Sequence, residues 1–337
     1  MLRIYHQEEI ARLCKRRSGE VKLGERIRVM QQSQDLKHLD DYAKEGVRFV
    51  ILGCPESIGP QANLGRAGSE KGWSAFLQTF LNTQSNRYLM GEEVLLLGHI
   101  MLDDLQAQAQ LPAAGESERI QQLRYLVGQI DNRLGEVLQR IYASNLIPIL
   151  IGGGHNNAYP LLKSWNQVHH EPLQCINCDP HADVRPLEGR HSGNSFSYAF
   201  ESGNMSRYLA LGLHQAYNSE TNYRFLEHSD QLHWINLEEI NDWKAAVAQA
   251  CAFFDAKQPL GLELDMDGIT GMPSSALTPA GISMDQARYF VRTVAEQLHP
   301  VYLHLPEAAP GDDTESRIIV GKALSYLVRD FIASVSA

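Results

Sequence analysis

The stretch that most restricts how this chain can fold is an apolar run that ends in potential metal ligands. Leu173 to Cys178 has the pattern of a short buried strand, and Asp179, His181 and Asp183 follow it at alternate positions. On an extended segment these three side chains point to the same side. Carboxylates gathered there raise one another's pKa and are costly to bury without a compensating cation. Taken alone, the pattern is equally typical of a metal site and of a solvated turn.

Two further apolar runs end in the same kinds of residue. Residues 146–150 lead into three glycines and then His155, and residues 261–264 lead into Asp265 and Asp267. The glycines let the backbone approach a ligand closely, but they lack the Lys-Ser/Thr of a phosphate loop. Sites in open α/β sheets form outside the carboxyl ends of the strands. The three strand ends together therefore favour a metal site.

The ligand count predicts two ions. Four carboxylates and two imidazoles are too many for one ion, and four negative charges balance two dications. Oxygen-rich ligation with two nitrogens and no thiolate favours Mn(II) over Zn(II). The expected ligands are His155, Asp179, His181, Asp183, Asp265 and Asp267.

The same segments resemble the signatures of the ureohydrolases, the family of arginase, agmatinase and formimidoylglutamase. That family carries a G-G-[DG]-H turn, a D-A-H-x-D segment and a late strand that ends D-x-D. Here the second segment reads D-P-H-A-D at 179–183, and the ligands stay in register. The turn at 63–68 is similar to the family's N-x-G-R-x-G turn, and Glu307 matches an acidic residue placed against the substrate's nitrogens. The resemblance covers roughly residues 45–335.

The resemblance implies a role for each residue. One ion would be held by His155, Asp179, Asp183 and Asp265, and the other by Asp179, His181, Asp265 and Asp267. Such a pair of ions lowers the pKa of a water between them toward neutrality. The implied catalytic residues are Asp183, which accepts the proton of the nucleophile, and Glu307, which pairs with the substrate's cationic nitrogens. The implied substrate-binding residues are Arg185, His191, Asn194 and Glu307.

Departures from the family pattern indicate a branch. The formimidoylglutamase branch is favoured by Gly154 before the first histidine, Arg185 after the aspartates, Phe196 in place of a histidine, and the run 274–279. Asn156 and Asn194 are less typical of that branch, and Asn194 is closer to the arginases.

The expected function is that of a binuclear manganese hydrolase that cleaves a C–N bond of a linear amidine. Formimidoylglutamate, giving glutamate and formamide in histidine metabolism, is the favoured substrate. One alternative is a guanidino hydrolase of the arginase or agmatinase type. Another is a non-catalytic relative that binds metal. A deacetylase of the same fold would use one zinc ion and lack the histidine that His155 supplies.

Alternating apolar and amphipathic stretches predict the fold class. They indicate an α/β protein, a single three-layer domain with a mostly parallel sheet and helices on both faces, as in arginase. The domain is expected over residues 46–337, preceded by an N-terminal helical extension over residues 1–45. The stretch 106–117 is expected to be a surface loop.

Composition and charge limit the possible partners and location of the protein. A net charge of −10 argues against nucleic acid as a partner, and the absence of a long apolar stretch argues against a membrane. The expectation is a cytoplasmic homo-oligomer that acts on a small molecule. Five cysteines give no disulfide framework. Cys175 and Cys178 should point to opposite faces of their strand, which argues against a redox pair.

Overall fold

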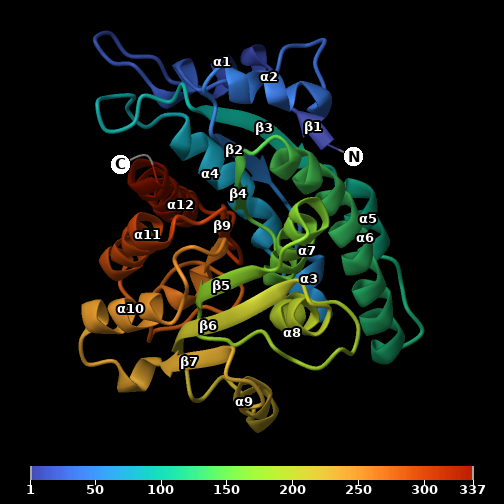
Figure 1. The fold of residues 1–337 in the computed structure, drawn as a ribbon. Coiled ribbons are helices and arrows are strands. Elements are labelled where there is room, and N and C mark those ends of the chain that lie inside the picture. The colour runs from blue at the N-terminus through green and yellow to red at the C-terminus, as the bar shows by residue number, and fades with distance from the viewer. Residues whose placement is uncertain (1, 336–337) are drawn as a thin grey trace.

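The computed structural model describes residues 2–335 and contains a nine-stranded sheet covered by helices on both faces (Figure 1). The strand order is β1-β3-β2-β4-β9-β8-β5-β6-β7, and all neighbours are parallel except β1 and β3. The strands are β1 Leu2–Ile4, β2 Phe49–Gly53, β3 Val94–Ile100, β4 Ile147–Ile151, β5 Leu173–Cys178, β6 Met205–Leu213, β7 Leu232–Asn236, β8 Leu260–Leu264 and β9 Tyr302–Leu305.

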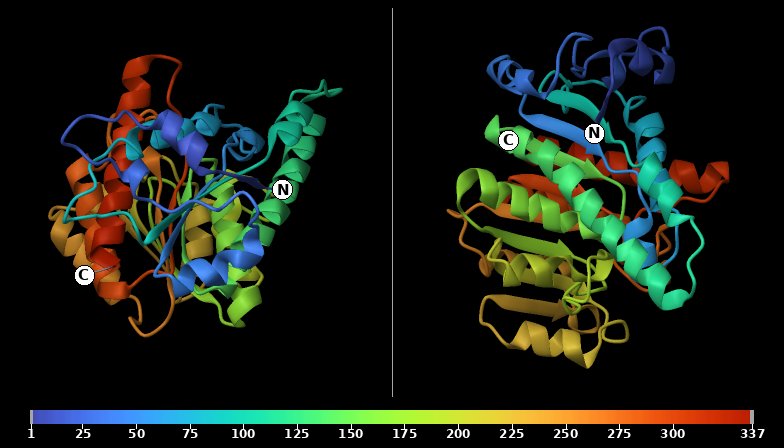
Figure 2. Two further views of the ribbon diagram at one scale, coloured as in Figure 1. Left: turned by 90° about the horizontal axis from the view of Figure 1, so that it is seen from above. Right: turned by 90° about the vertical axis from the view of Figure 1, so that its right-hand side faces the viewer.

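The helices form two layers, one on each side of the sheet. In Figure 2 (left) the C-terminal helices, in orange and red, lie on one side and the long green helix on the other. The α-helices are α1 Gln7–Leu13, α2 Leu39–Lys44, α3 Ile58–Ala62, α4 Gly72–Phe80, α5 Asp103–Ala109, α6 Glu116–Ala143, α7 Ala158–His169, α8 Ser195–Glu201, α9 Glu220–Glu227, α10 Trp243–Ala252, α11 Met284–Leu298 and α12 Thr314–Val335. The predicted α/β fold with a mostly parallel sheet and helices on both faces is confirmed.

Two apolar clusters, one on each face of the sheet, form the core. In β5, Ile176 and Cys178 belong to one cluster and Cys175 to the other, because alternate side chains of a strand face opposite ways. Cys175 and Cys178 are both free thiols on opposite faces, as expected. Every residue of β5 is buried, so the core covers this strand on both faces.

Local sequence explains the helices that frame the site. Helix α6 buries Leu123, Leu126, Ile130 and Leu134 along one side, at the spacing of an amphipathic helix. Helix α11 starts with a capping box, in which the Ser283 hydroxyl accepts from the backbone N–H three residues later. These helices pack onto opposite faces of the sheet.

The N-terminal region contains two helices, α1 and α2, where the sequence predicted a helical extension. It also contains β1, which the sequence did not predict and which pairs antiparallel with β3 at the edge of the sheet. The division of the chain at residue 45 stays a prediction. The expected loop 106–117 was partly wrong, because residues 103–109 form helix α5, which buries Leu105 and Ala109. No helix within residues 2–335 is long and apolar enough to cross a membrane.

The strand order brings the predicted ligands together. Strands β4, β9, β8 and β5 are neighbours and parallel, so their carboxyl ends meet at one edge. His155, Glu307, Asp265 and Asp179 each follow one of these four strands.

Candidate metal centre

The ligand residues lie in the loops just beyond the strands. Strand β5 ends at Cys178 and β8 at Leu264, so the alternation of an extended segment does not continue through the aspartates. Asp265 instead caps a short 3₁₀ turn by accepting from the Asp267 amide at 2.7 Å. Asp183 has a left-handed backbone, with φ of +50°, which is uncommon for a residue with a side chain. The sequence predicted these residues as ligands. The prediction that their side chains alternate along an extended strand was wrong.

Three aspartate oxygens surround one nitrogen of the buried His155 ring. Its Nδ1 lies 3.1 Å from Oδ2 of Asp179, 3.0 Å from Oδ2 of Asp183 and 2.9 Å from Oδ2 of Asp265. The four side chains are the same set that the sequence assigned to one ion, and they have the spacing of a possible metal site. The Nδ1 atom of His155 has no hydrogen-bond partner among the described residues.

The second predicted set lies on the other side of Asp179. Nδ1 of His181 is 3.3 Å from Oδ1 of Asp179 and 3.9 Å from Oδ2 of Asp267. One oxygen of Asp179 thus faces His155 and the other faces His181. This is the arrangement of a carboxylate that bridges two ions.

The electrostatics of this cluster fit cations. Burial, and then the charges of Asp179 and Asp267, raise the pKa of Asp265 well above its usual range. Burial and the Asp179 charge likewise raise the pKa of Asp183. Carboxylates that resist ionisation for these reasons are stabilised as anions by divalent cations. The donors are oxygen and imidazole nitrogen, which suit Mn(II).

Glu307 closes the site from β9. Its Oε1 accepts from the backbone N–H of His155 at 2.7 Å, while its buried Oε2 has no hydrogen-bond partner within residues 2–335. Burial and the nearby Asp267 raise the pKa of Glu307 to about 8. Its backbone is also left-handed, with φ of +64°. Strained backbone at two predicted catalytic residues, Asp183 and Glu307, is typical of functional sites.

A cavity of about 470 Å³ opens onto the cluster. Asp183, Asp265, Asp267 and Glu307 line its floor, and Arg185 lies on its wall. A small polar molecule bound in this cavity would therefore lie beside the aspartates.

Two predicted substrate-binding residues do not line this cavity. Asn194 is buried and accepts from Arg190 Nη1 at 2.6 Å, and it donates to the Gly189 carbonyl at 2.8 Å. His191 is also buried, and its Nδ1 accepts from the Gly193 amide at 3.1 Å. Both side chains brace the loop 189–194, whose Gly193 does line the cavity.

A buried ion pair ties that loop to the rest of the site. Nε of Arg190 lies 2.9 Å from Asp131 on α6, and Nη2 donates to the Asn156 carbonyl at 2.8 Å. The guanidinium contacts the rings of both Tyr159 and Tyr198. Arg190 thus connects α6, the turn after β4 and the loop 189–194.

Sequence reasoning missed Glu56, which supports the glycine turn. Its buried carboxylate accepts from the amides of Gly154 at 2.7 Å and Gly59 at 2.9 Å. Gly153 has φ of +75°, and a Cβ there would lie 2.6 Å from the Cys54 carbonyl. The sequence shows only an acidic residue in the loop after β2. Its contact with the glycine turn joins residues that are far apart in the chain.

Phe196 also has a structural place. It is fully buried, and its ring packs edge-on against His155 with centroids 5.2 Å apart. On its other side it stacks on Tyr208 at 4.4 Å. The histidine ring is therefore held by an apolar neighbour.

An open, mostly parallel sheet with a buried aspartate and histidine cluster at its carboxyl edge defines a metal-dependent hydrolase. The chain belongs to the arginase family, whose model matches residues 47–332.

Relatives within this family are distant in sequence. A formimidoylglutamase of Streptococcus pyogenes is 23% identical over 304 residues, which is 85% of each chain. A structure of Trypanosoma cruzi formiminoglutamase with Mn²⁺ has a TM-score of 0.70 at 21% identity, covering 93% of this chain and 98% of that one. Bacillus subtilis formimidoylglutamase has a TM-score of 0.72 at 14% identity, covering 96% and 94%. The likenesses to the two solved structures show the fold, and the family rests on the match of its model.

Proposed function

We propose that the protein is a binuclear Mn(II) hydrolase that cleaves the C–N bond of a linear amidine, with formimidoylglutamate giving glutamate and formamide. The observation that carries this proposal is the position of Asp179, whose two oxygens face His155 and His181 separately. The names of the relatives from S. pyogenes and B. subtilis support the choice of substrate.

The chain's own groups have distinct tasks in this reaction. When bound, the two ions supply a nucleophilic water of lowered pKa. Asp183, at the cavity floor, would accept the proton of that water. The free Oε2 of Glu307 would pair with the cationic amidine nitrogens in a charge-assisted contact, which holds the planar carbon beside Asp183. The cavity walls position the remainder of the substrate.

Arg185 is the cation best placed to bind a substrate carboxylate. It lines the cavity, and its Nη2 lies 3.3 Å from Glu188. Arg190 is engaged with Asp131, and Arg66 donates to the carbonyls of residues 274 and 275. The alternative, a guanidino substrate, is favoured by Glu188, because this acid beside Arg185 suits the ammonium group of arginine or agmatine.

A substrate comparison tests the proposal. Purified protein reconstituted with Mn(II) should hydrolyse formimidoylglutamate with a higher kcat/KM than arginine, agmatine or shorter guanidino acids. Higher activity on arginine or agmatine would assign the guanidino alternative. Two bound ions without turnover of any of these compounds would identify a non-catalytic relative.

Removing the metal should destabilise the protein, and more so at about pH 7.5 than at about pH 5.5. Binding to the native state contributes about 4 kcal/mol at a thousandfold excess over Kd. In the metal-free protein the pKa values of Asp183, Asp265 and Asp267 are raised, mainly by burial, and that of His181 is raised to about 10 by Asp179, although burial opposes this.

A group whose pKa is higher in the folded state than in the unfolded state favours folding when it is protonated. Its contribution to stability is lost as the pH rises through the pKa of the folded state. The pKa of Asp179 is lowered by its two histidine neighbours, against the effect of burial, so this carboxylate is ionised throughout the pH range and adds no change of stability within it. Because the other four groups act in the same direction, the metal-free protein should have a lower Tm at the higher pH. Calorimetry before and after chelation measures this, and identical Tm values would contradict a buried metal centre.

The setting of the enzyme is also part of the proposal. We infer a cytoplasmic homo-oligomer that acts in histidine breakdown, because the substrate is a fragment of that amino acid. The acidic net charge of −10 supports a soluble protein. Sedimentation velocity on the Mn(II)-loaded protein would measure its assembly state.

A further inference from the structure

A layer of buried polar side chains crosses the sheet directly beneath the aspartates. Glu263 on β8 pairs in register with Asn177 on β5 and with His304 on β9. All three side chains are fully buried. A charged residue is rarely buried in a central strand without a specific partner. The partners of Glu263 therefore indicate its task.

The carboxylate of Glu263 is held from two directions. Tyr302 donates its hydroxyl to Oε1 at 2.7 Å, and Nδ1 of His304 lies 2.6 Å from Oε2. Gly261 makes room for the Tyr302 ring, because a Cβ at Gly261 would lie 2.3 Å from that ring. These contacts fix the orientation of the Glu263 carboxylate.

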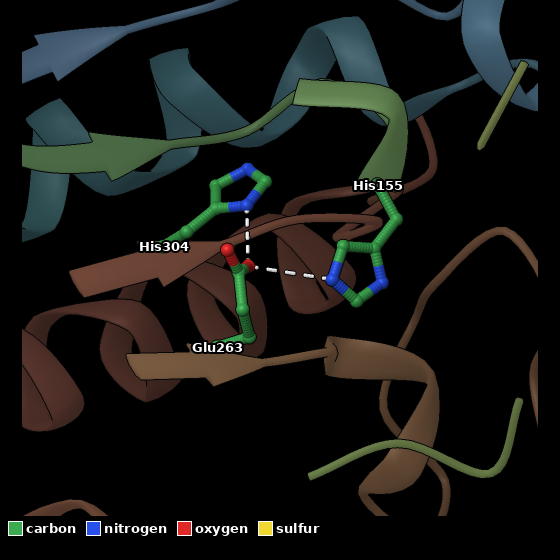
Figure 3. Close-up of side chains that lie close together, drawn as sticks. All are labelled: His155, Glu263 and His304. Atoms are coloured by element: carbon green, nitrogen blue, oxygen red, sulfur yellow. Dashed lines mark hydrogen bonds and ion pairs between the residues drawn. The ribbon is translucent and has the colours of Figure 1, made fainter. Parts of the chain in front are cut away.

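That orientation directs Glu263 at His155. Oε2 lies 3.3 Å from Nε2 of His155, on the opposite side of the ring from Nδ1, which faces the three aspartates. Figure 3 shows the Glu263 carboxylate between the rings of His304 and His155. A neutral imidazole carries one N–H, and the other nitrogen keeps a lone pair. The site needs that lone pair at Nδ1.

We propose that Glu263 is the positioning residue of His155. With the N–H of the ring kept at Nε2, facing this carboxylate, Nδ1 remains the metal-binding nitrogen; Glu263 also fixes the orientation of the ring and makes the ligand more basic. Carboxylates that accept the second N–H of a ligating histidine have this effect in metal sites generally. The inference rests on the proposed manganese centre and adds a residue that holds no ion itself.

The spacing argues against a separate ion among Glu263, His304 and His155. Ligands of one ion each lie about 2.0–2.2 Å from it, which sets them roughly 3 Å or more apart. The 2.6 Å between His304 and Glu263 is the distance of a charge-assisted hydrogen bond. His304 therefore orients Glu263, as Tyr302 does.

The test measures Mn(II) binding to metal-free protein by calorimetric titration and electron paramagnetic resonance. Glu263→Gln should weaken the ion held by His155 by about 10- to 100-fold, the usual effect of losing such a partner. At an Mn(II) concentration that gives the wild-type protein an exchange-coupled pair, this variant should give the six-line spectrum of one isolated ion. Unchanged affinity at both sites would overturn the inference.

Two further variants separate positioning from a general effect on the core. Tyr302→Phe removes only the hydroxyl that donates to Oε1, and it should weaken the same ion by about 3- to 10-fold even if Glu263→Gln does not fold. Cys251→Ala is the matched control, because Cys251 is a buried free thiol in the apolar cluster on the other face of the sheet from Tyr302. It should bind Mn(II) as the wild type does.

An equal loss of affinity in Cys251→Ala and Glu263→Gln would refute positioning. Unchanged affinity in Tyr302→Phe would refute it as well. If the wild-type protein binds no Mn(II) at all, the proposed function itself fails. The two failures are thus distinguishable.

Discussion

Glu307→Gln should lower kcat/KM by about 30- to 5000-fold while the protein still binds two Mn(II) ions. Glu307 lines the cavity, its buried Oε2 has no hydrogen-bond partner within residues 2–335, and a neutral amide there pairs poorly with an amidinium. Losing one partner of a desolvated charged contact costs about 2–5 kcal/mol, which corresponds to that range of rates. Steady-state kinetics on formimidoylglutamate, with elemental analysis of the same samples, measures both quantities.

The metal content decides how this result is interpreted. Glu307 Oε1 accepts from the His155 amide, and a glutamine oxygen can keep that hydrogen bond. The exposed Glu315 at the start of α12 provides a matched control, and Glu315→Gln should leave kcat/KM unchanged. Loss of Mn(II) from Glu307→Gln would mean that Glu307 maintains the metal centre and does not bind the substrate.

Asp179→Asn should weaken both ions and reduce activity by about 1000-fold or more. Its two oxygens lie 3.1 Å from His155 and 3.3 Å from His181, so one substitution affects both halves of the centre. Without the ions the reaction loses its activated water and several kcal/mol of charge stabilisation in the transition state, at 1.36 kcal/mol for each tenfold in rate. Mn(II) titration and kinetics on the same preparation measure the two effects together.

Asp183→Asn provides the contrast, because Asp183 faces His155 and would hold one ion only under the proposed function. It should weaken one ion and leave the other bound. The exposed Asp40 on α2 gives a control for the chemical change, since Asp40→Asn should alter neither binding nor rate. Two tightly bound ions in Asp179→Asn would show that Asp179 does not bridge.

Much of the fold could be predicted because its determinants are local. The apolar runs that became β4, β5 and β8 are short and bounded by polar residues, and the stripe on α6 has helical spacing. Helices α4 and α5 and strand β1 were not predicted. Their sequences are short or mixed, and packing against the sheet decides their structure.

The candidate ligands were also readable, because each follows an apolar strand within a few residues. His155, Asp179 and Asp265 could be named from such local patterns. Glu56 and Glu263 could not be given their partners, since these lie about a hundred residues away in one case and on neighbouring strands in the other. Asn194 and His191 were expected at the substrate, whereas the structure has them inside the loop they brace.

The sequence by itself determined where the candidate metal ligands lie along the chain, since residue type and position at the end of a strand are local properties. The tertiary structure alone decided how they meet. Strands β8 and β9 come last in the chain but lie between β4 and β5, which places Asp265 and Glu307 between His155 and Asp179. The physical reason is that strand order depends on how both apolar faces of the sheet are covered by helices, which is a property of the whole chain.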